Sequence, residues 1–306
     1  MNFADRLFQR VRDTNSRVVV GLDPAWDSLP DPYRAGRGRE GQAQCVESFC
    51  RRIIDAVSGL CAAVKPQAAF FEALGAPGWS ALEGVCAHAH AAGIPVILDA
   101  KRGDIGSTSA AYARGLLIPA GPLDLGTNVD ALTVNPYLGS DGIGPFIDAC
   151  RAHDKGLFVL VKTSNPSSAE LQDLQLSSAG RPMYEAVASA VSCWGGALQG
   201  VLGYSAIGAV VGATHPAVLE DLRDQFPRVP FLVPGFGAQG AQAADVARAF
   251  GPEGLGAVVN SSRGILFAFT QEPYRSEYGG DRFDQAAADA CRRMRDEINL
   301  AADRKS

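Results

Sequence analysis

The sequence predicts an α/β fold, a (β/α)8 TIM barrel with long strand-to-helix loops at its C-terminal rim. Three observations support this prediction. Short apolar runs of strand length alternate with longer stretches of helical periodicity along most of the chain. Several of these runs are apolar throughout, as parallel strands covered on both faces are. The connections that follow the strands are longer than those that precede them, and barrel enzymes build their sites on those loops.

The expected strands are spaced regularly along the chain. They span residues 17–22, 61–65, 95–99, 129–134, 157–162, 209–212, 229–233 and 255–259. Strand–helix alternation repeated eight times is typical of the closed barrel. A doubly wound open sheet is the alternative, but it would place a Gly-rich turn after the first strand. This chain has Gly-Leu-Asp-Pro there instead.

The segments between the strands carry the spacing of amphipathic helices. Val46, Phe49, Ile53 and Val57 recur at steps of three and four, which puts one apolar stripe on a helix. The stretch 283–303 repeats this spacing. We expect the helix after the first strand to begin near residue 44, at the end of a loop of about twenty residues; ordinary connections run about 2–6 residues.

Composition limits the classes of protein to consider. With 306 residues, 47% of them hydrophobic, the chain can bury a large core. We expect one domain over residues 1–306, because neither a linker nor a low-complexity tract divides it. The net charge of −5 gives no electrostatic reason to expect nucleic acid or a membrane surface as a partner. Neither a signal peptide nor a membrane span is predicted, so we expect a cytoplasmic protein. Seven cysteines without a CxxC pair indicate neither a disulfide framework nor a zinc site.

Charged residues gather at the ends of the second and third expected strands. Asp99 and Lys101 are two positions apart, so on an extended chain both side chains point to the same face, the mouth of the barrel. Asp104 follows in a turn, and Lys65 ends the strand before. These four groups could form an alternating network that keeps both lysines protonated and lets one of them donate a proton to a carbanion. The alternative is an ion-pair cluster that only joins two strands.

The ends of the seventh and eighth expected strands suit a phosphate group. Residues 234–240 read Pro-Gly-Phe-Gly-Ala-Gln-Gly, whose backbone N–H groups could approach an anion just before a helix N-terminus. Arg263 follows the last strand and offers a forked donor. Barrels often bind phosphate with these two loops. The alternative is that the glycines only form turns and that Arg263 is solvated.

Other polar residues at the rim are weaker candidates. Asp23 could accept hydrogen bonds from sugar hydroxyls or could be a turn residue before a proline. Ser164 and Thr163 could contact a base or could cap a turn. His88 and His90 diverge on a helix, so we expect surface residues rather than metal ligands.

The residues of these motifs resemble the sequence motifs of one enzyme family. Asp-Ala-Lys-Arg-Gly-Asp at 99–104 resembles the Asp-x-Lys-x-x-Asp signature of the orotidine 5′-phosphate decarboxylases. GLDP, VKPQ, KTSNP, VPGFGAQG and NSSRGI occur around it in the family's order, from about Asp23 to Arg263. KRGDIGSTS and the long loops resemble the bacterial type 2 subfamily.

The resemblance implies decarboxylation of orotidine 5′-monophosphate to uridine 5′-monophosphate, a step of pyrimidine biosynthesis, by a carboxy-lyase that uses neither cofactor nor metal. Lys101 would protonate C6 of the ring as carbon dioxide leaves, and Asp99 would lie against the substrate carboxylate. Lys65 and Asp23 would bind ribose hydroxyls. Asp104 would cross the interface of a homodimer into the partner's site.

The resemblance also implies a set of substrate contacts. Ile105 and Thr108 would accompany Asp104 into the neighbouring subunit, and Ser164 would contact the pyrimidine. The remaining substrate-binding residues, at the base and phosphate end, would be Pro234, Gly237, Gln239 and Arg263.

Two other functions are weighed against this one. A related phosphosugar decarboxylase that uses magnesium would need a carboxylate where this chain has Lys65, which would repel the ion. A catalytically inactive barrel that binds a nucleotide would be expected to lack the proton donor, and Lys101 is present.

Overall fold

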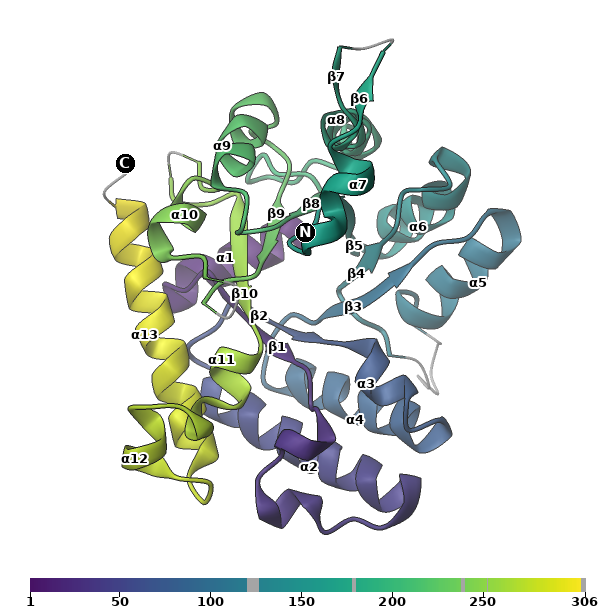
Figure 1. Ribbon diagram of the computed structural model, residues 1–306. Helices are drawn as coiled ribbons and strands as arrows, with labels where there is room; N and C mark the ends of the chain where they lie inside the picture. Colours follow the sequence, from purple (N-terminus) through teal and green to yellow (C-terminus); the bar gives the residue numbers. More distant parts are fainter. Residues whose placement is uncertain (120–126, 178–179, 238–239, 252, 304–306) are drawn as a thin grey trace.

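Parallel strands form a barrel in the computed structural model, which describes residues 1–119, 127–177, 180–237, 240–251 and 253–303 (Figure 1). In this part of the chain the main sheet has eight strands, in the order β2-β1-β10-β9-β8-β5-β4-β3. They are β1 (Val18–Leu22), β2 (Ala63–Pro66), β3 (Ile97–Arg102), β4 (Ala131–Val134), β5 (Gly156–Lys162), β8 (Ile207–Val211), β9 (Phe231–Pro234) and β10 (Ala257–Ser261).

The two ends of this sheet meet between β2 and β3. Parallel bridges join Val64 to Val96 and Gln67 to Asp99, and the amide of Val64 donates to the carbonyl of Pro95 at 3.0 Å. The sheet therefore closes on itself, and the predicted TIM barrel is confirmed.

Each predicted strand corresponds to an observed one, but most begin later than predicted. The expected runs at 61–65, 95–99, 129–134, 229–233 and 255–259 each start two residues before the strand does. Four of the five first residues are apolar and buried ahead of the strand: Cys61, Val129, Val229 and Leu255. Periodicity detects that burial but cannot detect where ladder hydrogen bonds begin.

Helices surround the barrel, with α13 along one side (Figure 1). The long ones are α1 (Phe3–Thr14), α2 (Gly38–Val57), α4 (Ala76–Ala91), α5 (Gly106–Leu116), α6 (Ser140–His153), α8 (Met183–Gly195), α9 (Pro216–Gln225) and α13 (Phe283–Asp303). The short ones are α3 (Ala68–Glu72), α7 (Ala169–Gln172), α10 (Ala243–Ala247), α11 (Arg263–Leu266) and α12 (Tyr274–Tyr278). The prediction for 283–303 is confirmed, whereas α2 begins at Gly38, earlier than predicted.

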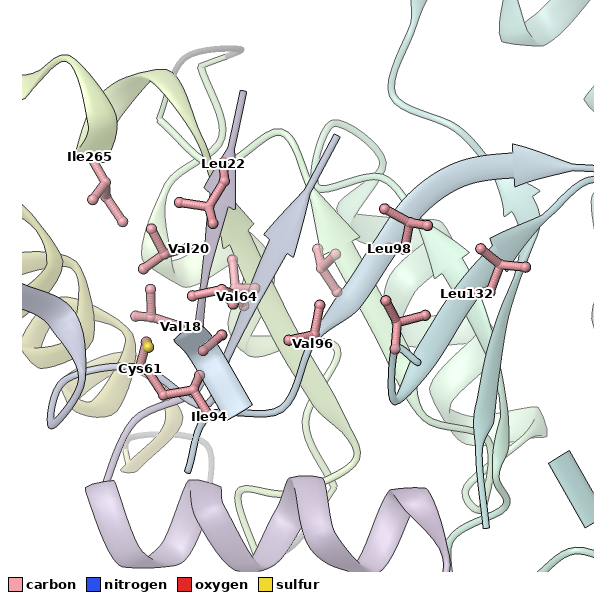
Figure 2. Close-up of a cluster of buried hydrophobic side chains, with 14 of the residues drawn as sticks. Val18, Val20, Leu22, Cys61, Val64, Ile94, Val96, Leu98, Leu132 and Ile265 are labelled. Atoms are coloured by element: carbon pink, nitrogen blue, oxygen red, sulfur yellow. The ribbon is translucent and has the colours of Figure 1, made fainter. Parts of the chain in front are cut away.

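The larger apolar core fills the space between the strands and the helices. Figure 2 shows part of it, with Val18, Val20 and Leu22 on one face of β1 and Val64 on β2. All four side chains are fully buried. Because the strands are covered on this outer face and filled on the inner one, their sequences are apolar at consecutive positions.

A second core lies inside the barrel and includes the N-terminal helix α1. Phe3, Leu7 and Phe8 of α1 pack with inward side chains of the strands, and the ring of Phe3 meets that of Phe158 edge-on, 5.9 Å between centroids. Gly156 leaves the space, since a Cβ there would lie 2.1 Å from the Phe3 ring. The helix thus closes the end of the barrel opposite the strand C-termini.

Three long connections rise at the other end, as predicted. The β1–α2 connection holds 3₁₀ turns at Trp26–Ser28 and Asp31–Arg34. The β5–α8 connection holds a third at Pro166–Ser168, α7 and a two-stranded hairpin, whose strands are β6 (Gln175–Leu176) and β7 (Arg181–Pro182). The hairpin extends away from the barrel (Figure 1). The β10–α13 connection carries α11, α12 and a 3₁₀ turn at Ala268–Thr270.

Two further observations bear on the predictions from composition. Among the described residues, no helix has both the length and the apolar character needed to cross a lipid bilayer. Of the seven cysteines, all free, most are buried in the core, but Cys193 is exposed and Cys45 is partly buried.

Candidate active site

Along five strands the inward-facing residues change towards the mouth of the barrel, from apolar to polar on four of them and from valine to glycine on β1. In the lower layer, Val19, Ala63, Ile97, Ala131 and Val258 pack against α1. Two positions further along, where a strand presents the same face again, the corresponding residues are Gly21, Lys65, Asp99, Thr133 and Asn260. A polar layer therefore lies at the mouth of the barrel, on top of an apolar one.

Lys65, Asp99 and Lys101 form the centre of this layer. Nζ of Lys65 lies 2.8 Å from Oδ2 of Asp99, and Nζ of Lys101 lies 2.6 Å from Oδ1 of the same carboxylate. Lys65 and Asp99 are buried, while the side chain of Lys101 is 47% exposed. The carboxylate of Asp99 thus pairs with two ammonium groups: that of Lys65, which is buried, and that of Lys101, which is exposed at the mouth of the barrel.

Two neutral residues that the sequence analysis missed complete the hydrogen bonds of Asp99. The Thr133 hydroxyl donates to Oδ1 at 3.0 Å, and the Gln67 amide donates to Oδ2 at 3.1 Å. Thr133 also accepts from the backbone amides of Ala100 and Lys101. These contacts hold the carboxylate in one orientation. A polar residue at an inward strand position was the signal that could have identified Thr133.

The charges in this cluster stabilise one another. Burial alone would raise the pKa of Asp99, but the ammonium groups of Lys65 and Lys101 outweigh it and hold that pKa well below its usual range. Burial alone would lower the pKa of Lys65, but the charges of Asp99 and Asp23 raise it above its ordinary value. Lys65 is therefore a cation and Asp99 an anion at neutral pH.

A cavity of about 180 Å³ opens beside this cluster. The predicted site residues that line it are Asp23, Lys65, Asp99, Ser164, Pro234 and Arg263. They come from the ends of six strands, β1, β2, β3, β5, β9 and β10, that are far apart in the sequence. The structure thus brings together most of the residues selected from the strand ends. Phe236 and Asn260 also line the cavity, and the sequence analysis gave neither a role.

Two oxygen acceptors in this cavity have no partner within the described chain. Oδ1 of Asp23 and Oδ1 of Asn260 are both buried and accept no hydrogen bond there. Burial raises the pKa of Asp23, although Lys65 and a hydrogen bond from Ser262 oppose that shift. Buried acceptors are normally paired, so both oxygens are available to a ligand that donates hydrogen bonds.

The loop after β9, predicted to bind phosphate, turns at two glycines with positive φ. Gly235 and Gly237 have φ of 100° and 71°, which glycine adopts without strain. Gln239, predicted to bridge base and phosphate, lies outside the described residues. The helix that follows, α10, is short, and Gln242 and Asp245 already cap its N-terminus. The expected contact between this helix N-terminus and a phosphate stays a prediction.

Arg263 occupies the position predicted for a phosphate ligand. It is exposed, lines the cavity, and makes no ion pair with any described residue. It also lines a second cavity of about 800 Å³, formed by the β1–α2 and β10–α13 connections. Arg263 is thus shared by the linings of both cavities.

Asp104 does not join the ion pairs of its own chain. Its carboxylate accepts from the amide of Ile105 at 2.8 Å and pairs with no cation in the described part of the chain. Ile105 is 55% exposed, and Thr108 is exposed as well. Within one chain, therefore, three of the four predicted charges meet and the fourth points elsewhere.

The loop that carries Ser164 is fastened by an ion pair that the sequence analysis did not assign. Nζ of Lys162 lies 2.6 Å from Oδ1 of Asp173, and the Lys162 side chain is 2% exposed. Gln172 accepts from the amide of Thr163 and donates to its hydroxyl, both at 2.9 Å. These contacts tie α7 to the end of β5 beside Ser164.

Within the described residues, three or more His, Cys, Asp or Glu side chains are nowhere grouped so that they could hold a metal ion. His88 and His90 instead contact Asp55 and Asp130, at 2.7 and 3.0 Å.

Comparison with known proteins was made for the family, for curated sequences and for solved structures. Residues 16–272 match the family model described as Orotidine 5'-phosphate decarboxylase / HUMPS family. The orotidine 5'-phosphate decarboxylase of Rhodopirellula baltica is 44% identical over 301 residues, covering 97% of this chain and 99% of the relative. That of Haloarcula marismortui is 43% identical over 299 residues, covering 98% and 99%.

A solved structure of Leishmania donovani OMP decarboxylase is 36% identical, with a TM-score of 0.74, and covers 99% of this chain and 100% of that one. The match of the family model over most of the chain, the identity to these relatives and the barrel with its charged mouth agree with one another. The chain belongs to the orotidine 5′-phosphate decarboxylase / HUMPS family.

Proposed function

We propose that this protein converts orotidine 5′-monophosphate into uridine 5′-monophosphate and carbon dioxide. The observation that carries the proposal is the buried carboxylate of Asp99 between two ammonium groups, at a cavity that Arg263 also lines. Such a site offers opposite charges at the reacting carbon and a cation for a distant phosphate. The family membership supports the same reaction.

The cavity accommodates the substrate in one direction. The base and ribose occupy the 180 Å³ space between Ser164 and Asp23, and the phosphate extends to Arg263 and the turn at Gly237, at the side of the larger cavity. Pro234 borders the base from β9. Binding energy from the distant phosphate then holds the ring against the charged cluster.

The proposed chemistry uses the two residues at the mouth. The bond between C6 and the carboxylate carbon breaks, and its electron pair remains on C6. Asp99, kept ionised by its two lysines, lies near the departing carboxylate, and Lys101 transfers a proton to C6. Lys65 holds Asp99 in place and contacts the ribose. Fixed charges around an unstable carbanion supply most of the rate enhancement.

We also propose a homodimer with shared active sites. Ile105, Tyr112, Tyr137 and Leu138 are large apolar side chains that are exposed after β3 and β4, and Asp104 lies beside them without a cation. A second copy docked on this face would cover the apolar groups and receive Asp104, Ile105 and Thr108 near its ribose site.

The remaining assignments rest on the same resemblance. We propose that the chain belongs to the bacterial type 2 subfamily, and its KRGDIGSTS segment and long loops support this proposal. It is proposed to act in the cytoplasm, as one catalytic domain over residues 1–306, without a metal or another cofactor.

The experiment follows the ultraviolet absorbance of orotidine 5′-monophosphate after enzyme is added, with and without EDTA. We expect substrate absorbance to fall equally in both samples, and uridine 5′-monophosphate to form in equal amount by chromatography. Binding of the product nucleotide without turnover would favour an inactive nucleotide-binding barrel, and turnover abolished by EDTA would favour a metal-dependent relative.

A further inference from the structure

A buried amide at the end of β10 lies in the polar layer of the barrel without a complete set of hydrogen bonds. Asn260 is 7% exposed and lines the same cavity as Asp23 and Asp99. Its Oδ1 has no partner in the described chain. Val258, two positions earlier on the same face of the strand, belongs to the apolar layer that packs against α1, so packing alone would favour an apolar residue at position 260 as well.

The direction of the hydrogen bonds around Asn260 determines what it can offer. Its Nδ2 faces Oγ of Ser262 at 3.4 Å, and the Ser262 hydroxyl in turn donates to the carboxylate of Asp23. Ser262 has one proton, and that proton is used on Asp23. The chain of donors therefore runs from Asn260 through Ser262 to Asp23, and it leaves an acceptor oxygen free at each end.

Gly21 provides the room for this arrangement on the neighbouring strand. A Cβ at residue 21 would lie 1.9 Å from Oγ of Ser262 and 3.0 Å from Oδ1 of Asn260. A side chain on β1 would thus displace the hydroxyl and press on the amide. The two strands are shaped so that these polar groups reach the cavity.

We propose that Asn260 is a further substrate-binding residue, which accepts a hydrogen bond from one ribose hydroxyl while Asp23 accepts from the other. The two free acceptors, one at each end of the Asn260–Ser262–Asp23 chain, match the two donors of a ribose cis-diol. This inference rests on the proposed function, since it concerns the ribose of the same nucleotide. It predicts that this protein prefers a ribonucleotide to a deoxyribonucleotide, and that part of this preference comes from the Asn260 side-chain amide.

The test combines a change in the protein with a change in the ligand. Binding of uridine 5′-monophosphate, its 2′-deoxy analogue and its 3′-deoxy analogue is measured by calorimetry for the wild-type protein and for Asn260→Leu, which is similar in size and cannot accept a hydrogen bond. Asn260→Ser is the second variant, in case the leucine perturbs folding, and circular dichroism melting checks each protein.

We expect the wild-type protein to bind uridine 5′-monophosphate about 3- to 10-fold more tightly than one of the deoxy analogues because of this contact, the range of one neutral hydrogen bond. In Asn260→Leu the ratio for that analogue falls towards one, while the ratio for the other analogue, read by Asp23, is retained. Equal weakening of all three ligands would overturn the assignment of Asn260 and leave the proposed function standing. Failure of the wild-type protein to bind uridine 5′-monophosphate would overturn both.

Discussion

The ammonium of Lys101 lies 2.6 Å from the carboxylate of Asp99 (Nζ to Oδ1) on a backbone that glycine would adopt more easily. Residue 101 has φ of 47°, in the left-handed region, where a side chain with a Cβ is strained by about 1 kcal/mol or more. The position therefore keeps a strained lysine at the mouth of the barrel. Strain retained at a site of this kind indicates that the side chain is needed for function rather than for folding.

Lys101→Gly is expected to abolish catalysis without loss of stability. Glycine relieves the backbone, and the ion pair that is lost is half-exposed, so the free energy of unfolding should stay constant or rise by up to about 1 kcal/mol. Turnover should fall by at least about 1,000-fold, because no other proton donor is proposed. Turnover by absorbance and urea denaturation measure the two effects. Lys101→Ala, which keeps the strain, is the matched control, and substantial activity in either variant would contradict the role of Lys101.

Asp130 lies at the end of the barrel opposite the cavity, and its ionisation makes the free energy of unfolding depend on pH. Its carboxylate accepts from Arg6 at 3.0 Å, from His90 at 3.0 Å and from the amide of Val96 at 2.9 Å. Burial opposes ionisation, but the contacts with His90 and Val96 and the charges of His90 and Lys155 prevail and lower the pKa to about 2. The folded pKa lies below the unfolded value of about 3.9, so the stabilisation is complete above pH 5 and is lost as the pH falls towards 2.

We therefore expect Asp130→Asn to lose roughly 2–3 kcal/mol of unfolding free energy at pH 7 and to show a flatter decline of stability between pH 5 and 3 than the wild-type protein. Turnover at 25 °C should be unchanged, since Asp130 precedes β4 at the end away from the cavity. Urea denaturation at several pH values provides the measurement. Asp148→Asn removes an exposed carboxylate that pairs with Arg151, and this control should leave both quantities unaltered. If the stability of Asp130→Asn fell with pH as steeply as that of the wild-type protein, the pH dependence could not be assigned to Asp130.

The charged mouth of the barrel was predictable because it depends on two local rules. Strand ends at one rim meet whatever the order of the strands, and residues two apart share a face, which is how Asp99, Lys101 and Lys65 were selected. Long-range partners were not predictable. In the sequence, Thr133 looks like an ordinary strand residue. Only the pairing of β3 with β4 brings its hydroxyl to the carboxylate of Asp99.

The position of α1 at the end of the barrel and the Lys162–Asp173 ion pair could not be predicted for a similar reason. Leu7 and Phe8 give α1 an apolar stripe, but nothing in the stripe says that it enters the barrel rather than covering its side. Lys162 was visible at the end of β5, yet its counter-ion Asp173 lies in a connection without strong periodicity. The direction of Asp104 could not follow from one chain, because its expected partner belongs to a second copy.

Arg263 is expected to bind the phosphate of the nucleotide and no other part of it. The Arg263→Gln variant retains a polar side chain but loses the charge and the fork, so binding of uridine 5′-monophosphate should weaken by about 10- to 100-fold, the range for a hydrogen bond to a charged group. Binding of uridine, which lacks the phosphate, should be unchanged. Calorimetry with both ligands separates the contribution of the phosphate from that of the nucleoside. Equal weakening for uridine would mean that Arg263 shapes the cavity rather than binding phosphate.

The Lys162–Asp173 ion pair should govern how well the loop after β5 holds the base. In Asp173→Asn the buried ammonium loses its counter-charge, and α7 should detach more readily from Thr163 and Ser164. We expect the KM for orotidine 5′-monophosphate to rise about 3- to 10-fold and kcat to change less, since the charged cluster is untouched. Limited proteolysis should cut faster between residues 165 and 182. Glu170→Gln, an exposed carboxylate on the same helix, serves as the control, and a kcat loss with constant KM would contradict this role.

Asp104 and Lys101 should complement each other across two subunits if the site is shared. Each single variant, Lys101→Ala or Asp104→Ala, is expected to be nearly inactive. In a mixed dimer, one of the two sites would receive Lys101 from one chain and Asp104 from the other, so about a quarter of all sites should be intact in an equal mixture after random exchange. Activity of the mixture is compared with that of each variant, after subunit exchange has been verified by mass spectrometry of tagged chains. Activity that stays at the level of the single variants would show that Asp104 acts within its own chain, and the exposed face around Ile105 would then need another explanation.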